Sequence, residues 1–183
     1  KIFNEKGYKY ASVRVPYYAG KKSTQVGNLE GVIYTMNEEG KISNQKLSEE
    51  DFYRQRINDR IGMVTFTFPN LKAGCVLEYQ YTIEEKRRLE FDFWFIQSDL
   101  PVAYTEMITV VPTFASVKAI LFGNDTVSQK KEMLTKGLDK EKTIYYKENI
   151  KSFRPEPFMS SISDHLLRMG FILSKQKSLF MEE

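Results

Sequence analysis

Residues 65–83 read Thr65-Phe-Thr-Phe-Pro-Asn-Leu-Lys-Ala-Gly-Cys-Val-Leu-Glu-Tyr-Gln-Tyr-Thr-Ile83, and this stretch decides the fold class. Just before the turn at Pro69, three apolar residues alternate with threonines; they are Val64, Phe66 and Phe68. A side-chain period of two is typical of a β-strand with one buried face. β-branched and aromatic residues suit that pleated, half-buried surface. The stretch therefore predicts two strands joined by a turn.

The turn between the two strands has its own sequence signals. Pro69 lacks an N–H and cannot sit in a central ladder, so the first strand should end there. Asn70 and Gly74 can adopt positive φ angles at the turn. Beyond the turn, alternation predicts that one face of the second strand is buried. That face consists of Leu77, Tyr79, Tyr81 and Ile83.

Similar alternation recurs along the chain, with turn residues between the segments. A short helical turn is expected at residues 48–51, where Ser48 and Asp51 have the spacing of a capping box. Residues 19–28 are expected to form a loop, and residues 165–173 a closing strand, with a helix as the competing interpretation. Further strands are expected at residues 7–18, 29–36, 41–47, 104–111, 116–122, 128–135 and 143–150.

These segments together predict an all-β protein. Strands that recur at short spacing with turn signals between them are typical of a sandwich or barrel. We expect an antiparallel β-sandwich of about nine to eleven strands, with one or two short helical turns. A chain of 183 residues fits one large domain. The predicted boundaries are a single sandwich domain over residues 1–174 and a polar tail or linker start at residues 175–183.

The composition excludes several classes of protein. A hydrophobic content of 42% predicts a packed core and not a disordered chain. The net charge of +3 arises from 27 basic and 24 acidic residues, which argues against nucleic-acid binding. The charged run at residues 84–88 is interpreted as a solvated hairpin tip, with an anion site as the minor alternative. Nowhere does an uncharged run approach the ~20 residues that span a bilayer.

The sequence contains no recognisable catalytic constellation. Cys75 is the one thiol and His165 the one imidazole, and they belong to separate predicted strands. Thiol catalysis needs a base within hydrogen-bond reach, so we expect Cys75 to be a small structural side chain and His165 an ordinary strand residue. One Cys and one His are too few for a zinc site. We therefore predict no catalytic residue, no metal site and no cofactor.

The richest aromatic cluster lies at Phe91, Phe93, Trp94 and Phe95. Such a run forms core more often than it forms a platform on which sugar rings stack, and we favour the core interpretation. The candidate ligand or interface surface of the chain is placed here, at Trp94, Phe95 and Gln97.

Four stretches together resemble a known family; they are residues 1–7 with 10–18, residues 33–34 with 40–42, residues 66–81 and residues 94–104. The stretch from Phe66 to Tyr81 and the run Phe95-Ile-Gln-Ser-Asp-Leu-Pro101 are the most specific of these. They are similar to the domain of unknown function that precedes transglutaminase-like domains in exported Gram-negative bacterial proteins. The resemblance implies a β-sandwich, a secretory signal upstream and a papain-like transglutaminase domain downstream. Where this chain has Cys75, the family pattern usually shows Ser.

The resemblance implies a non-catalytic accessory or interaction domain that positions substrate or partner domains. Its expected partner is the downstream transglutaminase-like domain of the same polypeptide, and its expected location is the periplasm or cell envelope. Because residue 1 is Lys, we expect a fragment or processed product. The alternative function is a carbohydrate- or cell-envelope-binding module that uses the aromatic cluster and contacts an envelope protein or glycan.

Overall fold

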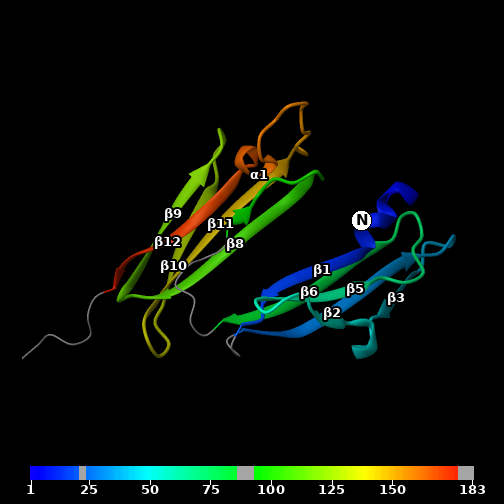
Figure 1. Ribbon diagram of the computed structural model, residues 1–183, viewed down its shortest axis with the longest axis horizontal. Coiled ribbons are helices and arrows are strands. Elements are labelled where there is room, and N and C mark those ends of the chain that lie inside the picture. Colours follow the sequence, from blue (N-terminus) through cyan, green and yellow to red (C-terminus); the bar gives the residue numbers. More distant parts are fainter. Residues whose placement is uncertain (21–23, 86–92, 177–183) are drawn as a thin grey trace, which may run out of the picture. The chain divides into compact units, whose positions relative to one another are not determined.

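The computed structural model shows an all-β protein built from antiparallel sheets, as the alternation predicted (Figure 1). The structure describes residues 1–20, 24–85 and 93–176. These residues form twelve strands, somewhat more than the nine to eleven expected, together with two short 3-10 helices and one short α-helix. Each of the strand pairs in the described ranges is antiparallel.

The chain divides into two compact units, Lys1–Arg87 and Arg88–Glu183. Each unit contains two three-stranded sheets and its own hydrophobic core. The prediction that residues 1–174 fold as one sandwich domain, and not as two independently folding domains, stays a prediction. The polar tail was expected from residue 175, but the last strand continues to Gln176.

The first unit has the strand orders β1-β5-β4 and β3-β2-β6. Its core is formed mainly by aliphatic and aromatic residues from both sheets. The elements are η1 (Glu5–Ala11), β1 (Ser12–Tyr18), β2 (Thr24–Met36), β3 (Ile42–Lys46), η2 (Glu49–Asp51), β4 (Tyr53–Arg56), β5 (Ile61–Thr67) and β6 (Val76–Glu85).

The stretch that decided the fold class forms β5, a turn and β6. Val64, Phe66 and Phe68 are at most 2% exposed, as predicted. Asn70 and Gly74 have φ angles of 54° and 90°, which confirms their role in the turn. The turn does not close a hairpin, because β5 pairs with β1 and β4 while β6 pairs with β2. It carries the chain from one sheet of the first unit to the other.

The predicted buried face of β6 is only partly covered. Tyr79 packs its ring against those of Phe66 and Phe68, at centroid distances of 5.6 Å and 6.5 Å. Nevertheless Tyr79, Tyr81 and Ile83 are 47%, 43% and 39% exposed. The strands β1, β5 and β4 contain seven, seven and four residues, whereas β2 and β6 contain thirteen and ten. The shorter sheet leaves part of the longer one uncovered.

The second unit has the strand orders β10-β11-β8 and β7-β12-β9. A hairpin joins β10 to β11 around Gly137, whose φ of 83° suits a glycine turn. β12 is the central strand of its sheet, which confirms the closing strand that the sequence predicted. The elements are β7 (Trp94–Phe95), β8 (Val102–Pro112), β9 (Ala115–Phe122), β10 (Ser128–Leu134), β11 (Lys140–Ile150), α1 (Ile162–His165) and β12 (Arg168–Gln176).

The ends of several elements differ from the predictions. The strand expected over residues 7–18 begins at Ser12, because the preceding residues form η1, where the Asn4 side chain accepts a hydrogen bond from the Lys6 N–H. That strand also passes through Pro16, which is tolerated because β1 is an edge strand. His165 was expected in a strand but lies in α1, and the strand begins at Arg168.

Other local predictions are confirmed or lie outside the described residues. At Ser48 the capping box forms, since the Asp51 carboxylate accepts hydrogen bonds from the Ser48 N–H and hydroxyl at 2.6 Å and 2.9 Å. The loop expected over residues 19–28 gives way to β2 from Thr24 onward. The anion site considered at residues 86–88 lies outside the described ranges. Within those ranges, no helix is long and apolar enough to cross a membrane.

Truncating Phe66 to alanine should lower the free energy of unfolding by about 3–5 kcal/mol, because Phe66 is 2% exposed and contacts Phe52, Phe68 and Tyr79. Tyr53→Ala is the matched control, since Tyr53 is 64% exposed in the same unit and should cost about 0.5 kcal/mol or less. Urea denaturation of both variants measures the difference. Equal losses would show that Phe66 is not a central core residue.

Candidate functional site

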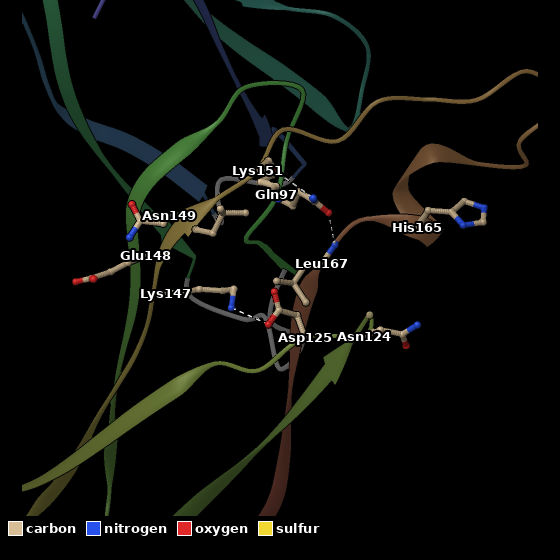
Figure 2. A pocket seen from close by; sticks show the side chains of 11 residues that line it. Gln97, Asn124, Asp125, Lys147, Glu148, Asn149, Lys151, His165 and Leu167 are labelled. Carbon is tan, nitrogen blue, oxygen red and sulfur yellow. Dashed lines mark hydrogen bonds and ion pairs between the residues drawn. The ribbon is translucent and has the colours of Figure 1, made fainter.

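A hollow of about 380 Å³ lies in the second unit, where the end of β11 meets the turns after β7 and β9 and the segment before β12 (Figure 2). Its wall combines amide, acidic and basic side chains over a floor that includes two aliphatic residues. The lining residues are Gln97, Gly123, Asn124, Asp125, Lys147, Glu148, Asn149, Ile150, Lys151, His165 and Leu167.

An ion pair between Lys147 and Asp125 spans one side of this hollow (Figure 2). The Lys147 ammonium donates to Asp125 Oδ1 at 2.9 Å and to the Thr126 carbonyl at 2.8 Å, and the Lys147 side chain is only 16% exposed. The Thr126 N–H donates to the same carboxylate oxygen at 2.7 Å. The hydrogen bond from Lys147, followed by that from Thr126, lowers the pKa of Asp125 below its usual value of 3.8.

Gln97, one of the predicted site residues, joins two segments beside the hollow. Its side-chain amide donates to the Lys151 carbonyl at 3.0 Å and accepts from the Leu167 N–H at 3.4 Å. The Gln97 backbone N–H also donates to the Leu167 carbonyl at 3.1 Å. These contacts hold the ends of β11 and β12 together, so the residue has a structural role whether or not a ligand binds.

The two other predicted site residues point in opposite directions from β7. Trp94 is 8% exposed and belongs to the core, where its Nε1–H donates to the Thr105 hydroxyl at 3.3 Å. Phe95 is 48% exposed. The core interpretation of Trp94 is therefore the one that the structure supports. Trp94, Phe95 and Gln97 do not form one surface, and ligand binding by Phe95 or Gln97 stays a prediction.

Phe93 and Phe122 form an exposed aromatic pair beside Phe95. Their ring centroids are 5.6 Å apart, and they are 46% and 37% exposed. The Arg168 guanidinium lies over both rings, at 4.9 Å and 5.2 Å from their centroids. Arg168 therefore covers one face of the Phe93 ring and one face of the Phe122 ring, on which a sugar ring would otherwise stack.

The thiol and the imidazole belong to different units. Cys75 is 1% exposed in the first core, and its carbonyl accepts a hydrogen bond from the Ile2 N–H at 2.8 Å. His165 lies in the second unit, where its Nε2 is hydrogen bonded to the Ser160 hydroxyl at 3.0 Å. In Figure 2 the His165 ring points away from Lys147 and Asp125. Cys75 is a small buried side chain, as the sequence predicted, whereas His165 lies in α1 and not in the predicted strand.

The lining of the hollow determines which chemistry it can offer. Of the four charged lysine and carboxylate side chains in the lining, Lys147 and Asp125 pair with each other, whereas Lys151 and Glu148 form no ion pair among the described residues. This arrangement suits neutral polar groups and supplies no activated nucleophile. Among the described residues, no three His, Cys, Asp or Glu side chains gather closely enough to hold a metal ion.

Sequence reasoning missed the Lys147–Asp125 pair because nothing local links two residues that are 22 positions apart. It also missed that the outward-facing residues of β8 and β11 share one surface. The alternation of residues 104–111 carried part of that signal, but only the strand register of β8 against β11 brings Tyr104 opposite Glu148 and Glu106 opposite Tyr146.

Comparisons with known proteins give one family and one solved structure. Residues 1–153 match the family described as a domain of unknown function with a solved structure, DUF3857. No curated protein matches the chain. A crystal structure at 2.00 Å resolution of a protein from Parabacteroides distasonis, named a putative protease, is similar with a TM-score of 0.69 and 17% identity. The match covers 92% of this chain but only 34% of that one.

Substituting Asp125 with asparagine should reduce stability in a pH-dependent way. Lys147 and Thr126 lower the folded-state pKa of Asp125 below 3.8, so the ionised form contributes stability above that pH. The contribution is lost as the pH falls through the folded-state pKa. The melting temperature of Asp125→Asn should lie below that of the wild type at neutral pH, and the gap should narrow as the pH falls below 3.8. A gap that is constant with pH would contradict this role.

Trp94→Ala and Phe95→Ala test the two faces of β7. We expect Trp94→Ala to cost about 3–5 kcal/mol, because it leaves a cavity in the second core. Phe95→Ala should cost roughly 0.5 kcal/mol or less, as for an exposed position. Chemical denaturation followed by tyrosine fluorescence and far-UV circular dichroism suits both variants. A Trp94→Ala protein as stable as the wild type would show that Trp94 is not a core residue.

Proposed function

The chain belongs to the DUF3857 family, and we propose that it is a non-catalytic accessory domain that positions substrate or partner domains within a larger exported protein. The observation that carries the proposal is the match to the Parabacteroides protein. The match covers 92% of this chain and 34% of that longer chain, which is named a putative protease. A β-rich module of this kind can present or shield substrate while another part of the polypeptide carries the chemistry.

The positions of the thiol and the imidazole support a non-catalytic role. Acyl transfer by a cysteine needs a thiolate, a base within hydrogen-bond reach and a group that orients the base. Cys75 is packed in the apolar core of the first unit and is only 1% exposed. His165 lies in the other unit, where it is hydrogen bonded to the Ser160 hydroxyl. The proposal therefore places no catalytic residue in this chain.

The resemblance of residues 66–81 and 94–104 to the domain that precedes transglutaminase-like domains supplies the proposed partner. This partner is a downstream papain-type transglutaminase-like domain of the same polypeptide. The same resemblance supports export to the periplasm or cell envelope. One cysteine and therefore no internal disulfide is compatible with an exported bacterial protein as well as with the cytosol.

A second candidate function is a carbohydrate- or cell-envelope-binding module. The specific observation in its favour is the exposed aromatic group at Phe93, Phe95 and Phe122. Burial of Trp94 and occupation of two rings by Arg168 both argue against it. We therefore rank it below the accessory function.

Deletion of residues 1–183 from the complete polypeptide tests the accessory function. We expect the remaining protein to lose thermal stability or to change its kcat/KM ratio between two peptide substrates, because the module no longer positions them. Adding the deleted chain in trans should restore part of the loss. Unchanged stability and kinetics would contradict the accessory function, and turnover by residues 1–183 alone that iodoacetamide abolishes would contradict the non-catalytic role.

A further inference from the structure

The outer face of β8 and β11 carries alternating tyrosine and glutamate side chains. The strand register places Tyr104 opposite Glu148 and Glu106 opposite Tyr146. Residues two apart on a strand share a face, so all four side chains lie on the same side of the sheet. The rings of Tyr104 and Tyr146 stack across the diagonal, with a centroid distance of 6.5 Å and an interplanar angle of 29°. We call these four residues the Tyr–Glu patch.

The two carboxylates of the Tyr–Glu patch lack a cationic partner among the described residues. The Glu106 carboxylate accepts a hydrogen bond from the Tyr104 hydroxyl at 2.7 Å, and this bond, with the charges of Glu106 and Glu148, raises the pKa of Tyr104. The nearest lysines on this sheet face pair elsewhere, since Lys130 and Lys142 contact Glu132 at 2.8 Å and 3.5 Å. The patch therefore combines uncompensated negative charge with stacked aromatic rings.

The Tyr–Glu patch borders an open sheet edge. In the described ranges β8 pairs only with β11, so its other side presents unpaired backbone groups. β8 has eleven residues, of which Glu106 is the one charged residue. Its outward-facing Ile108 and Val110 are 44% and 48% exposed. Proteins usually protect such edges with lysines, prolines or short strands.

The opposite edge of the same sheet shows that protection. β10 has seven residues, and Lys130, Lys131 and Glu132 follow one another along it. Lys130 pairs with Glu132, and Lys131 pairs with Glu141 at 2.9 Å. Two edges of one sheet thus differ: β10 is protected by charges along its length, whereas β8 is longer and carries one charged residue, Glu106, and one proline, Pro112, at its end.

We propose that the edge of β8 is a docking site for an extended peptide segment that adds as a fourth strand beside β8 and places an arginine or lysine side chain on the Tyr–Glu patch. Added strands bind through backbone hydrogen bonds and are selected through alternate side chains. Charge complementarity identifies the cation, because Glu106 and Glu148 can accept its hydrogen bonds while the tyrosine rings stack on it. The residues two positions away would be apolar, to pack on Ile108 and Val110. The inference rests on the proposed accessory function and names the kind of segment that such a domain would hold.

The docking site can be tested on the chain of residues 1–183 with two blocked synthetic peptides of alternating threonine and valine. The two peptides differ only in their central residue, which is arginine in one and glutamate in the other. We expect the arginine peptide to shift the amide NMR signals of β8 and to bind roughly tenfold more tightly than the glutamate peptide by calorimetry. The variant Ile108→Lys should abolish binding, because its ammonium pairs with Glu106, repels the peptide's arginine and protects the edge. The matched control is Met133→Lys, on the protected edge at 57% exposure, which should bind as the wild type does.

The variant Glu106→Gln provides a second test that does not depend on the folding of Ile108→Lys. It should remove most of the preference for arginine over glutamate while the backbone pairing remains. Equal binding of the two peptides, signal shifts away from β8, or equal loss in Ile108→Lys and Met133→Lys would overturn the proposal. So would a dimer in sedimentation analysis that Ile108→Lys dissociates, because the occupant would then be a second copy. None of these outcomes bears on the deletion experiment, which tests the accessory function separately.

Discussion

Sheets of only three strands impose the main constraint on this protein. Each sheet in the described ranges has one central strand and two edges, so much of the core depends on a few central strands. β5 contributes Val64 and Phe66, β2 contributes Ile33, β11 contributes Tyr145, and β12 contributes Met169 and Phe171. Burying a large apolar side chain contributes about 1.5–3 kcal/mol before entropy is subtracted. The loss of one such residue therefore removes a large share of the stability of a unit.

The same constraint determines where recognition can occur. Three-stranded sheets pack one face each and leave the other to solvent, so the outward-facing rows of β8 and β11 are available to form the Tyr–Glu patch. In a three-stranded sheet two of the three strands are edge strands, and each edge strand must be short, charged or paired. β4 is short and β10 is charged, whereas β8 is neither. The candidate sites therefore lie at strand ends and on edge strands, whereas the central strands form the core that supports them.

The polar hollow of the second unit follows from strand ends that converge. Lys147 near the end of β11 reaches Asp125 in the turn between β9 and β10, and Gln97 joins the chain before β12 to the chain after β11. The Lys147–Asp125 ion pair and the hydrogen bonds of Gln97 stabilise these loops. The β8 edge differs, because Glu106 and Glu148 have no cationic partner in the described part of the chain. That difference explains why a partner is proposed for the edge and not for the hollow.

The amino-acid sequence by itself determined the fold class, because side-chain period and turn chemistry are local. Alternation identified β5, β6 and the hairpin strands, and Asn70, Gly74 and Gly137 adopt the positive φ angles that turns require. For Trp94 the sequence favoured the core but also placed the residue on a candidate ligand surface, and the structure buries it. Only the tertiary structure decided which strands pair, that the chain has two cores, that much of β6 is uncovered and that Lys147 meets Asp125. Those features depend on contacts between residues far apart in the chain, and a local pattern carries no information about which distant strand will lie beside it.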